Sequence, residues 1–215
     1  MEPDAVEIRV LGCLIEKQRT TPDVYPLTLN ALRLACNQAT NRDPVVDYDE
    51  SVIRGAIDRL VQRKWATLAS WSNRRSMKYR HTLDGALGLD DAEVAVLDVL
   101  MLRGAQTPGE LKARTERLHR FGDMEELGAT LARLIERQLV ARLERRPGQR
   151  EERYTHLLGS DEGPEPEAVL PAEPEAAPPD QPPAADGLEE RFARIEQQLA
   201  ELRAQVQALR EARPG

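Results

Sequence analysis

A cluster of amide and guanidinium side chains occupies one short stretch of the chain, which reads CNQATNRDPV over residues 36–45. Its candidate contact residues are Asn37, Gln38, Asn41 and Arg42. Asparagine, glutamine, threonine and arginine all commonly hydrogen-bond to phosphate oxygens. The same stretch also suits a helix end, because asparagine tolerates left-handed backbone angles and Pro44 confines Asp43 to an extended conformation. This stretch, called the elbow below, is therefore either a cap and turn or a surface that faces a ligand.

Basic side chains form a second set of candidates, which could contact the phosphate backbone of DNA. They come from one predicted helix and from two predicted β-hairpins. In the first hairpin, Trp71 and Tyr79 lie among the basic residues. In the helix, the two arginines are four residues apart and so share a face. The full set is Arg59, Arg63, Arg74, Arg75, Lys78, Arg80, Arg145, Arg146 and Arg150. Exposed faces of helices and hairpins are often charged without binding anything, and that interpretation stays open.

The remaining residues give little indication of an enzyme active site. The chain has no P-loop, no glycine-rich dinucleotide turn, no HExxH helix and no CxxC pair. Its three histidines, His81, His119 and His156, are too few to indicate a metal site. Paired carboxylates such as Asp90 and Asp91 open predicted helices, where the helix dipole favours them. We therefore expect a protein that is not an enzyme and needs no cofactor.

The charge is distributed unevenly along the chain. Residues 1–85 carry 13 basic and 11 acidic side chains, residues 86–158 carry 12 and 13, and residues 159–215 carry 5 and 13. The formal net charge of −7 thus comes from the tail, and the body is nearly neutral. Cys13 and Cys36 occupy apolar helix positions, no apolar run is long enough to span a membrane, and no signal peptide is visible. We expect a cytoplasmic protein that does not contact the membrane.

An internal duplication organises the body of the protein. At an offset of 86 residues, Val10, Leu11 and Leu14 match Val96, Leu97 and Leu100. AIDRLVQRKW matches TLARLIERQL at an offset of 74, and KYRHTL later matches RYTHLL at an offset of 75. The matching segments keep their order and only the spacers between them change, so the chain contains two copies of one fold.

Each copy is predicted to form three helices followed by a β-hairpin. In the first copy the apolar periodicity predicts helices at residues 5–18, 27–37 and 51–64, then strands at 65–71 and 77–83. Capping boxes are expected at residues 47–50 and 123–126, and the second hairpin at 139–144 and 152–158. Three helices and a hairpin is the order of a winged helix. The predicted fold is mainly α with small β-hairpins (α+β), in two tandem winged-helix domains at residues 1–85 and 86–158.

The tail has two parts. Residues 159–187 are rich in proline, alanine and acidic residues, which predicts a disordered linker. Residues 188–211 repeat apolar side chains at spacings of four and three, which predicts a coiled-coil helix for self-association, although a helix docked on the body would share this pattern. Its seam residues are Leu188, Phe192, Ile195, Leu199, Leu202, Val206 and Leu209.

One longer segment carries a family resemblance. LIEKQRTTPDVYPLTLNALRLACNQATNRDPV, which begins at Leu14, resembles the YceH family of uncharacterised bacterial proteins. The resemblance spans roughly residues 4–158, and its most specific parts are the elbow and the TTPDxYPLxLNAL pattern before it. It implies a tandem winged-helix fold, as the periodicity does, and it implies no established activity.

Two functions therefore compete. A regulator that binds double-stranded DNA would use its basic hairpins on phosphates and its third helices in the major groove. Against this, the third helices begin with acidic residues, such as Asp49 and Glu50, which would approach the DNA backbone. A scaffold that binds another protein, and oligomerises through its C-terminal helix, suits the neutral body better. Fold alone does not decide between them.

Overall fold

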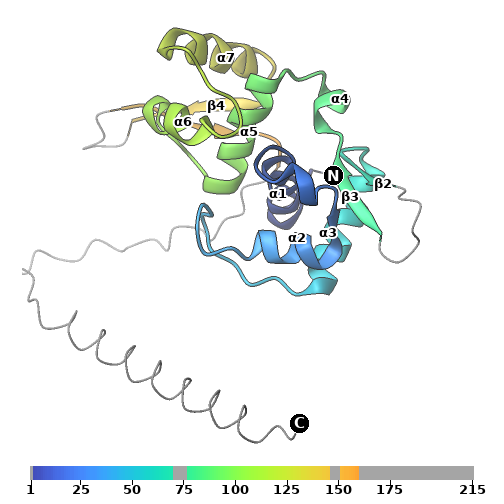
Figure 1. The fold of residues 1–215 in the computed structure, drawn as a ribbon. Coiled ribbons are helices and arrows are strands. Elements are labelled where there is room, and N and C mark those ends of the chain that lie inside the picture. Colours follow the sequence, from blue (N-terminus) through green and yellow to red (C-terminus); the bar gives the residue numbers. More distant parts are fainter. Residues whose placement is uncertain (1, 70–76, 146–150, 160–215) are drawn as a thin grey trace, which may run out of the picture. The chain divides into compact units, whose positions relative to one another are not determined.

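The computed structural model describes residues 2–69, 77–145 and 151–159, which combine α-helices with two small antiparallel sheets (Figure 1). The first part contains α1 (Ala5–Thr20), the 3-10 helix η1 (Pro22–Val24), β1 (Leu27–Thr28), α2 (Leu29–Cys36), α3 (Glu50–Gln62), β2 (Ala66–Ala69), β3 (Lys78–His81) and α4 (Leu83–Leu87). The second part contains α5 (Asp91–Arg103), α6 (Pro108–Thr115), α7 (Met124–Glu136), β4 (Val140–Leu143) and β5 (Arg153–His156). The predicted mixture of α-helices with small β-hairpins is confirmed. None of the helices described here is long and apolar enough to cross a membrane.

The first helix of each copy starts with the same cap. Asp4 caps α1 and Asp90 caps α5, and in each case a glutamate three residues later, Glu7 or Glu93, completes a capping box. These boxes satisfy backbone N–H groups that have no partner inside the helix. They also hold two glutamates at fixed, buried positions, which matters for the candidate site.

The capping boxes predicted at the third helices need correction. Asp49, rather than Asp47, caps α3, because the Asp49 side chain accepts the N–H of Val52. Asp123 caps α7 as expected, but the carboxylate of Glu126 accepts the N–H of Gly122 and does not return to the cap residue.

The two sheets are related but unequal. In the first, β3 lies between β2 and β1, with Tyr79 opposite Leu68 on one side and Leu27 on the other. In the second, β4 pairs with β5, and a single bridge from Gln106 to Tyr154 takes the place of the third strand. The sequence predicted both hairpins but not β1, because a two-residue strand leaves no alternation to detect.

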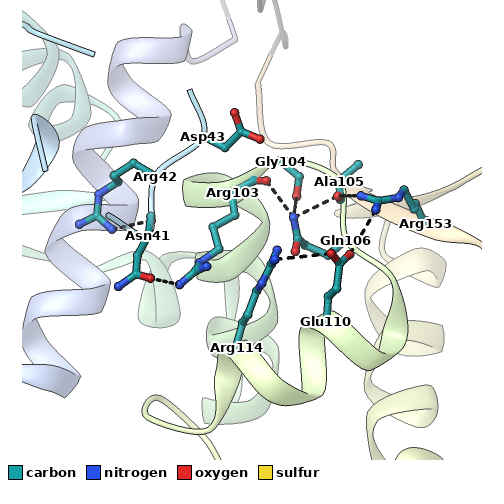
Figure 2. A pocket seen from close by; sticks show the side chains of 10 residues that line it. All are labelled: Asn41, Arg42, Asp43, Arg103, Gly104, Ala105, Gln106, Glu110, Arg114 and Arg153. Atoms are coloured by element: carbon teal, nitrogen blue, oxygen red, sulfur yellow. Dashed lines mark hydrogen bonds and ion pairs between the residues drawn. The ribbon is translucent and has the colours of Figure 1, made fainter. Parts of the chain in front are cut away.

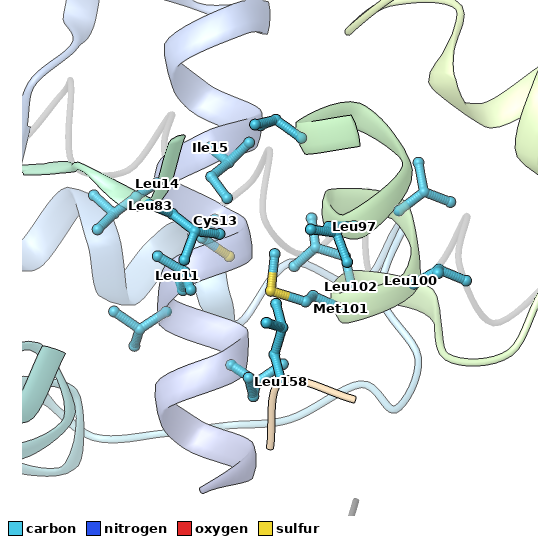
Figure 3. Close-up of a cluster of buried hydrophobic side chains, with 14 of the residues drawn as sticks. Leu11, Cys13, Leu14, Ile15, Leu83, Leu97, Leu100, Met101, Leu102 and Leu158 are labelled. Carbon is cyan, nitrogen blue, oxygen red and sulfur yellow. The ribbon is translucent and has the colours of Figure 1, made fainter. Parts of the chain in front are cut away.

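Helices α1 and α5 pack against each other and lie at the centre of the core (Figure 3). Arg19 near the end of α1 pairs with Asp91 at the start of α5, whereas Gly12 of α1 faces Leu102 near the end of α5. The two helices are therefore antiparallel. A Cβ atom added at Gly12 would lie 2.8 Å from Leu102 Cδ2, so glycine permits this close approach.

The core runs through both copies without a break. The matched leucines Leu11, Leu14, Leu97 and Leu100 are all fully buried. All of the described residues belong to one compact unit, and the predicted boundary after residue 85 falls inside it. Apart from Gly159, the predicted linker at 159–187 and the predicted coiled-coil helix at 188–211 lie outside the described residues and stay predictions.

Candidate functional site

The arginines of α3 are held by carboxylates at the start of α1. Arg59 Nε lies 3.1 Å from Glu7 Oε2, and its NH2 group lies 2.6 Å from Asp4 Oδ2. Arg63 Nε lies 3.1 Å from the other oxygen of Glu7. Glu7 itself is only 2% exposed, and a buried carboxylate is costly unless it is paired in this way.

The second copy repeats this arrangement residue for residue. Arg133 Nε lies 3.3 Å from Glu93 Oε1, and its NH2 group lies 3.0 Å from Asp90 Oδ2. Arg137 NH1 lies 3.2 Å from Glu93 Oε2. The arginine pairs that the sequence presents on one helix face thus fasten the third helix to the first helix. The carboxylate of Glu7 therefore competes for Arg59 and Arg63 with the phosphate contacts that the sequence suggests.

The outward surface at the start of α3 is largely acidic. Arg54, which is exposed, pairs with Glu50 at 2.8 Å, and Asp49 is engaged as the cap. Asp58 is also exposed on this helix. A phosphate backbone placed against the start of α3 would meet more negative than positive charge.

The first hairpin presents its basic residues differently. Side chains alternate along β3, so Tyr79 and His81 are buried while Arg80 between them is exposed and Lys78 is half-buried. The buried face is fixed by Tyr25, whose hydroxyl oxygen accepts the N–H of His81 at 2.9 Å. Lys78 and Arg80 therefore share the outer face of the hairpin. Arg74 and Arg75, predicted at its tip, lie outside the described residues.

In the second hairpin, a glutamate forms ion pairs with two of the arginines. Arg142 and Arg145 both approach the carboxylate of Glu152, at 3.3 and 3.6 Å. Arg146 and Arg150 lie outside the described residues. Of the basic residues predicted in this hairpin, Arg145 alone has a described environment, and it is an exposed ion pair.

In the elbow, Asn37 closes the loop that leads to α3. Its Nδ2 donates to the carbonyl oxygen of Tyr48 at 2.8 Å and to Asp47 Oδ1 at 3.2 Å. Its Oδ1 accepts the N–H of Tyr48 at 2.9 Å. The side-chain amide of Asn37 thus pairs with the N–H and carbonyl groups of Tyr48 as a neighbouring strand would. Asn37 is also the C-terminal cap residue of α2, as predicted.

Arg42 is the buried anchor of the elbow. Its side chain is fully buried and donates to both oxygens of Glu16, at 3.0 and 2.6 Å, as well as to Ala35 O and Gln38 Oε1. Burial disfavours the charge of Arg42, but the hydrogen bonds to Glu16 outweigh it and raise the pKa of the guanidinium. Arg42 thus ties the elbow to Glu16 of α1 and Ala35 of α2, and Gln38 supports it.

Asn41 is one of the exposed residues of the elbow. It adopts a left-handed conformation with φ of 62°, and its Oδ1 accepts a hydrogen bond from Arg103 at the end of α5. The N–H of Asp43 donates to the carbonyl oxygen of Leu102 at 2.9 Å. The elbow therefore joins the first copy to the second.

Two adjoining hollows lie where the elbow meets α5 and α6, and together they are called the junction cavity below. Their volumes are about 300 and 320 Å³, and both are lined by Asn41, Arg103 and Arg114. Figure 2 shows the first hollow, with Arg103 reaching Asn41 and Arg114 beside Glu110. Arg153 of β5 also lines it and donates to the carbonyl oxygen of Ala105 at 2.7 Å.

Two residues in the walls of the junction cavity each have a buried polar atom without a hydrogen-bond partner. Asp98 belongs to the wall of the second hollow and is only 1% exposed, but its unpartnered Oδ1 faces α1, where it lies 3.5 Å from the position of a Cβ atom added at Gly12. Gln106 Oε1 belongs to the wall of the first hollow, on a residue 2% exposed whose Nε2 donates to three carbonyl oxygens. Native proteins leave few such atoms unsatisfied.

Sequence reasoning missed Arg103, Arg114 and Asp98, although two signals were present. At the offset of 86, Arg103 matches Lys17, which lines the second hollow as well. Asp98 matches Gly12 and interrupts an otherwise apolar stretch between Glu93 and Arg103. The position of Arg114 became meaningful only once α6 was placed beside the elbow.

Comparison with known proteins gives a consistent result. Residues 4–149 match a family described as "Protein of unknown function, DUF480". A UPF0502 protein from Pelobacter propionicus is 47% identical over 95% of this chain and 91% of its own length. The UPF0502 protein YceH from Salmonella paratyphi B is 42% identical over 97% and 96%, and one from Azotobacter vinelandii is 50% identical over 74% and 70%.

Proposed function

The chain belongs to the DUF480 family of uncharacterised proteins, which includes YceH, and we propose that it is a non-enzymatic nucleic-acid-binding protein. The resemblance seen around the elbow is confirmed by these relatives. The proposal assigns a winged helix to each copy, supported by the order α1, α2, α3 and β2–β3, which α5, α6, α7 and β4–β5 repeat.

The observation that carries the proposal is the outer face of the first hairpin. Lys78 and Arg80 project from the same side of β3, and no carboxylate pairs with Arg80 among the described residues. In the proposed mode, this hairpin contacts backbone phosphates, and the unplaced Arg74 and Arg75 extend the contact. Such binding is salt-dependent and has little base specificity.

The third helices do not lead the contact in this proposal. Their arginines are engaged with Glu7 and Glu93, and α3 offers Glu50 and Asp58 to solvent. This arrangement supports a regulator that holds DNA by its hairpins, instead of one that reads bases with a recognition helix.

The test compares two variants in a titration of mixed-sequence duplex DNA at low salt. Replacing both Lys78 and Arg80 with alanine should weaken binding about tenfold, since two positive charges no longer reach the phosphates. Arg54→Ala removes one exposed positive charge from α3 and is the matched control, with an expected change below about twofold. If Arg54→Ala weakens binding more than the hairpin variant does, α3 leads the contact and the proposal fails.

A second candidate, a scaffold that binds another protein, is favoured by exposed apolar side chains. Leu34 of α2, Val45 of the elbow and Val52 of α3 are exposed, at 56%, 59% and 39%. Exposed apolar side chains suit a protein partner better than a phosphate backbone. The same titration separates the candidates, because a scaffold of this kind predicts no binding to duplex DNA even at low salt.

A further inference from the structure

The junction cavity concentrates positive charge that lacks carboxylate partners. Among the described residues, neither Arg103 nor Arg117 forms an ion pair with a carboxylate, and both line the second hollow together with Arg114. Arg114 is paired to Glu110 only loosely, at 3.4 Å, and Glu110 also faces Arg153 at 3.5 Å. The carboxylates present do not balance the guanidinium groups around the opening.

The charges also disfavour one another. Burial lowers the pKa of Arg103, and the positive charge of Arg114 lowers it further. Two guanidinium groups that face a shared open space gain most from an anion placed between them. Arginine is suited to this role, because its planar fork binds both oxygens of a carboxylate or phosphate.

Gln106 gives a second, independent sign of a ligand. It lies in the wall of the first hollow, is only 2% exposed, and has an amide oxygen without a hydrogen-bond partner. The unpartnered Oδ1 of Asp98 faces Gly12 of α1 and is not part of this evidence. Burial, with the nearby charge of Glu16, raises the pKa of Asp98 in the wall of the second hollow. A bound molecule that carries a donor group would satisfy the amide oxygen of Gln106.

We propose that the junction cavity binds a small anionic molecule whose phosphate or carboxylate group lies between Arg103, Arg114 and Arg117. The rest of the molecule occupies the hollows beside Asp98 and Gln106. Two hollows of about 300 and 320 Å³ suit a small metabolite and not a macromolecule. The inference does not depend on nucleic-acid binding.

The position of the site explains why only one copy has an elbow. Asn41 and Asp43 come from the first copy, whereas Arg103, Gln106 and Arg114 come from the second. The second copy has ERLHRFGD where the elbow would be, and it contributes α5 and α6 instead. A ligand in the junction cavity therefore contacts both copies and holds them together.

The test is calorimetric titration of the full chain with orthophosphate and, separately, with citrate, at constant ionic strength. The expected result is saturable binding of at least one of the two anions at a single site. Replacing Arg103 and Arg114 together with glutamine should raise the dissociation constant at least about tenfold, because charge-assisted hydrogen bonds are removed. Arg120→Gln is the matched control, since Arg120 is exposed and pairs only with the nearby Glu116.

Arg117→Gln is a second test variant, which keeps the proposal testable if the double variant fails to fold. Arg117 is exposed, so its replacement leaves the core intact and should still weaken binding several-fold. Phosphate binding alone indicates a phosphorylated ligand, and citrate binding alone indicates a carboxylate. The proposal is overturned if neither anion saturates, or if the arginine variants bind like Arg120→Gln.

Discussion

Single residues explain how the arginines of the third helices are held in place. Glu7 and Glu93 are buried where the first helix of each copy meets the third helix, and each needs positive partners within reach. Arg59 with Arg63, and Arg133 with Arg137, supply those partners from helices far away in sequence. A spacing of four residues showed that each pair shares a face but not which way that face points.

Glu7→Gln tests this structural role. The substitution keeps the size of the side chain but removes the carboxylate that Arg63 pairs with and leaves Arg59 with Asp4 alone, so stability should fall by about 2 kcal/mol. Glu50→Gln removes an exposed pair with Arg54 and should cost less than about 0.5 kcal/mol. Urea unfolding measures the free energy of unfolding of both variants. Equal losses of stability would show that the buried ion pairs of Glu7 contribute no more than the exposed pair of Glu50.

Asn37 and Asn41, which look alike in the elbow sequence, should differ in their contribution to stability. Asn37→Ala leaves the N–H and carbonyl of Tyr48 without their partners and should cost about 2 kcal/mol. Asn41→Gly keeps the left-handed backbone and should cost only a fraction of the stability loss expected for Asn37→Ala. Thermal unfolding of the two variants checks this order. The reverse order would mean that Asn41 is the structural residue.

At the scale of elements, apolar periodicity predicted α1, α2 and α3 to within a few residues. Periodicity succeeds where a helix buries one face, and α3 is such a helix, with Ile53, Ala56, Ile57 and Leu60 inside. It did not anticipate α4 or β1, which are too short to show a period. It also could not show that the elbow meets α5 and α6, because that contact joins segments far apart in the sequence, as Asn41 and Arg103 are. The junction cavity was therefore beyond sequence reasoning.

The close packing of α1 on α5 predicts opposite effects for two glycine substitutions. Gly12→Ala places a methyl group 2.8 Å from Leu102, a buried side chain with little room to move, and should destabilise by about 1–3 kcal/mol. Gly128→Ala, on the exposed face of α7, meets no atom within 4 Å and should stabilise by about 0.5–1 kcal/mol. Chemical unfolding reports both signs. A stabilising Gly12→Ala would show that the helices separate easily.

At the scale of the whole molecule, the body and the tail are expected to have separate roles. The seam from Leu188 to Leu209 predicts a dimer that forms with increasing concentration. Its flanking charges favour an antiparallel dimer. In that arrangement Glu189 and Glu196 of one chain meet Arg210 and Arg203 of the other chain. Removing residues 160–215 should leave a folded monomer. Sedimentation of the full and truncated chains decides, and a truncated body that still dimerises would place the interface in residues 1–159.

The most direct test of the proposed function is the salt dependence of DNA binding. The logarithm of the binding constant of the full chain should fall linearly with the logarithm of salt concentration, because binding to phosphates releases counterions. Replacing Arg74, Arg75 and Lys78 together with alanine should weaken binding to every sequence and reduce that slope by up to about three, one for each positive charge removed from a phosphate. Unchanged affinity and slope would exclude the first hairpin as the DNA-binding surface and contradict the account.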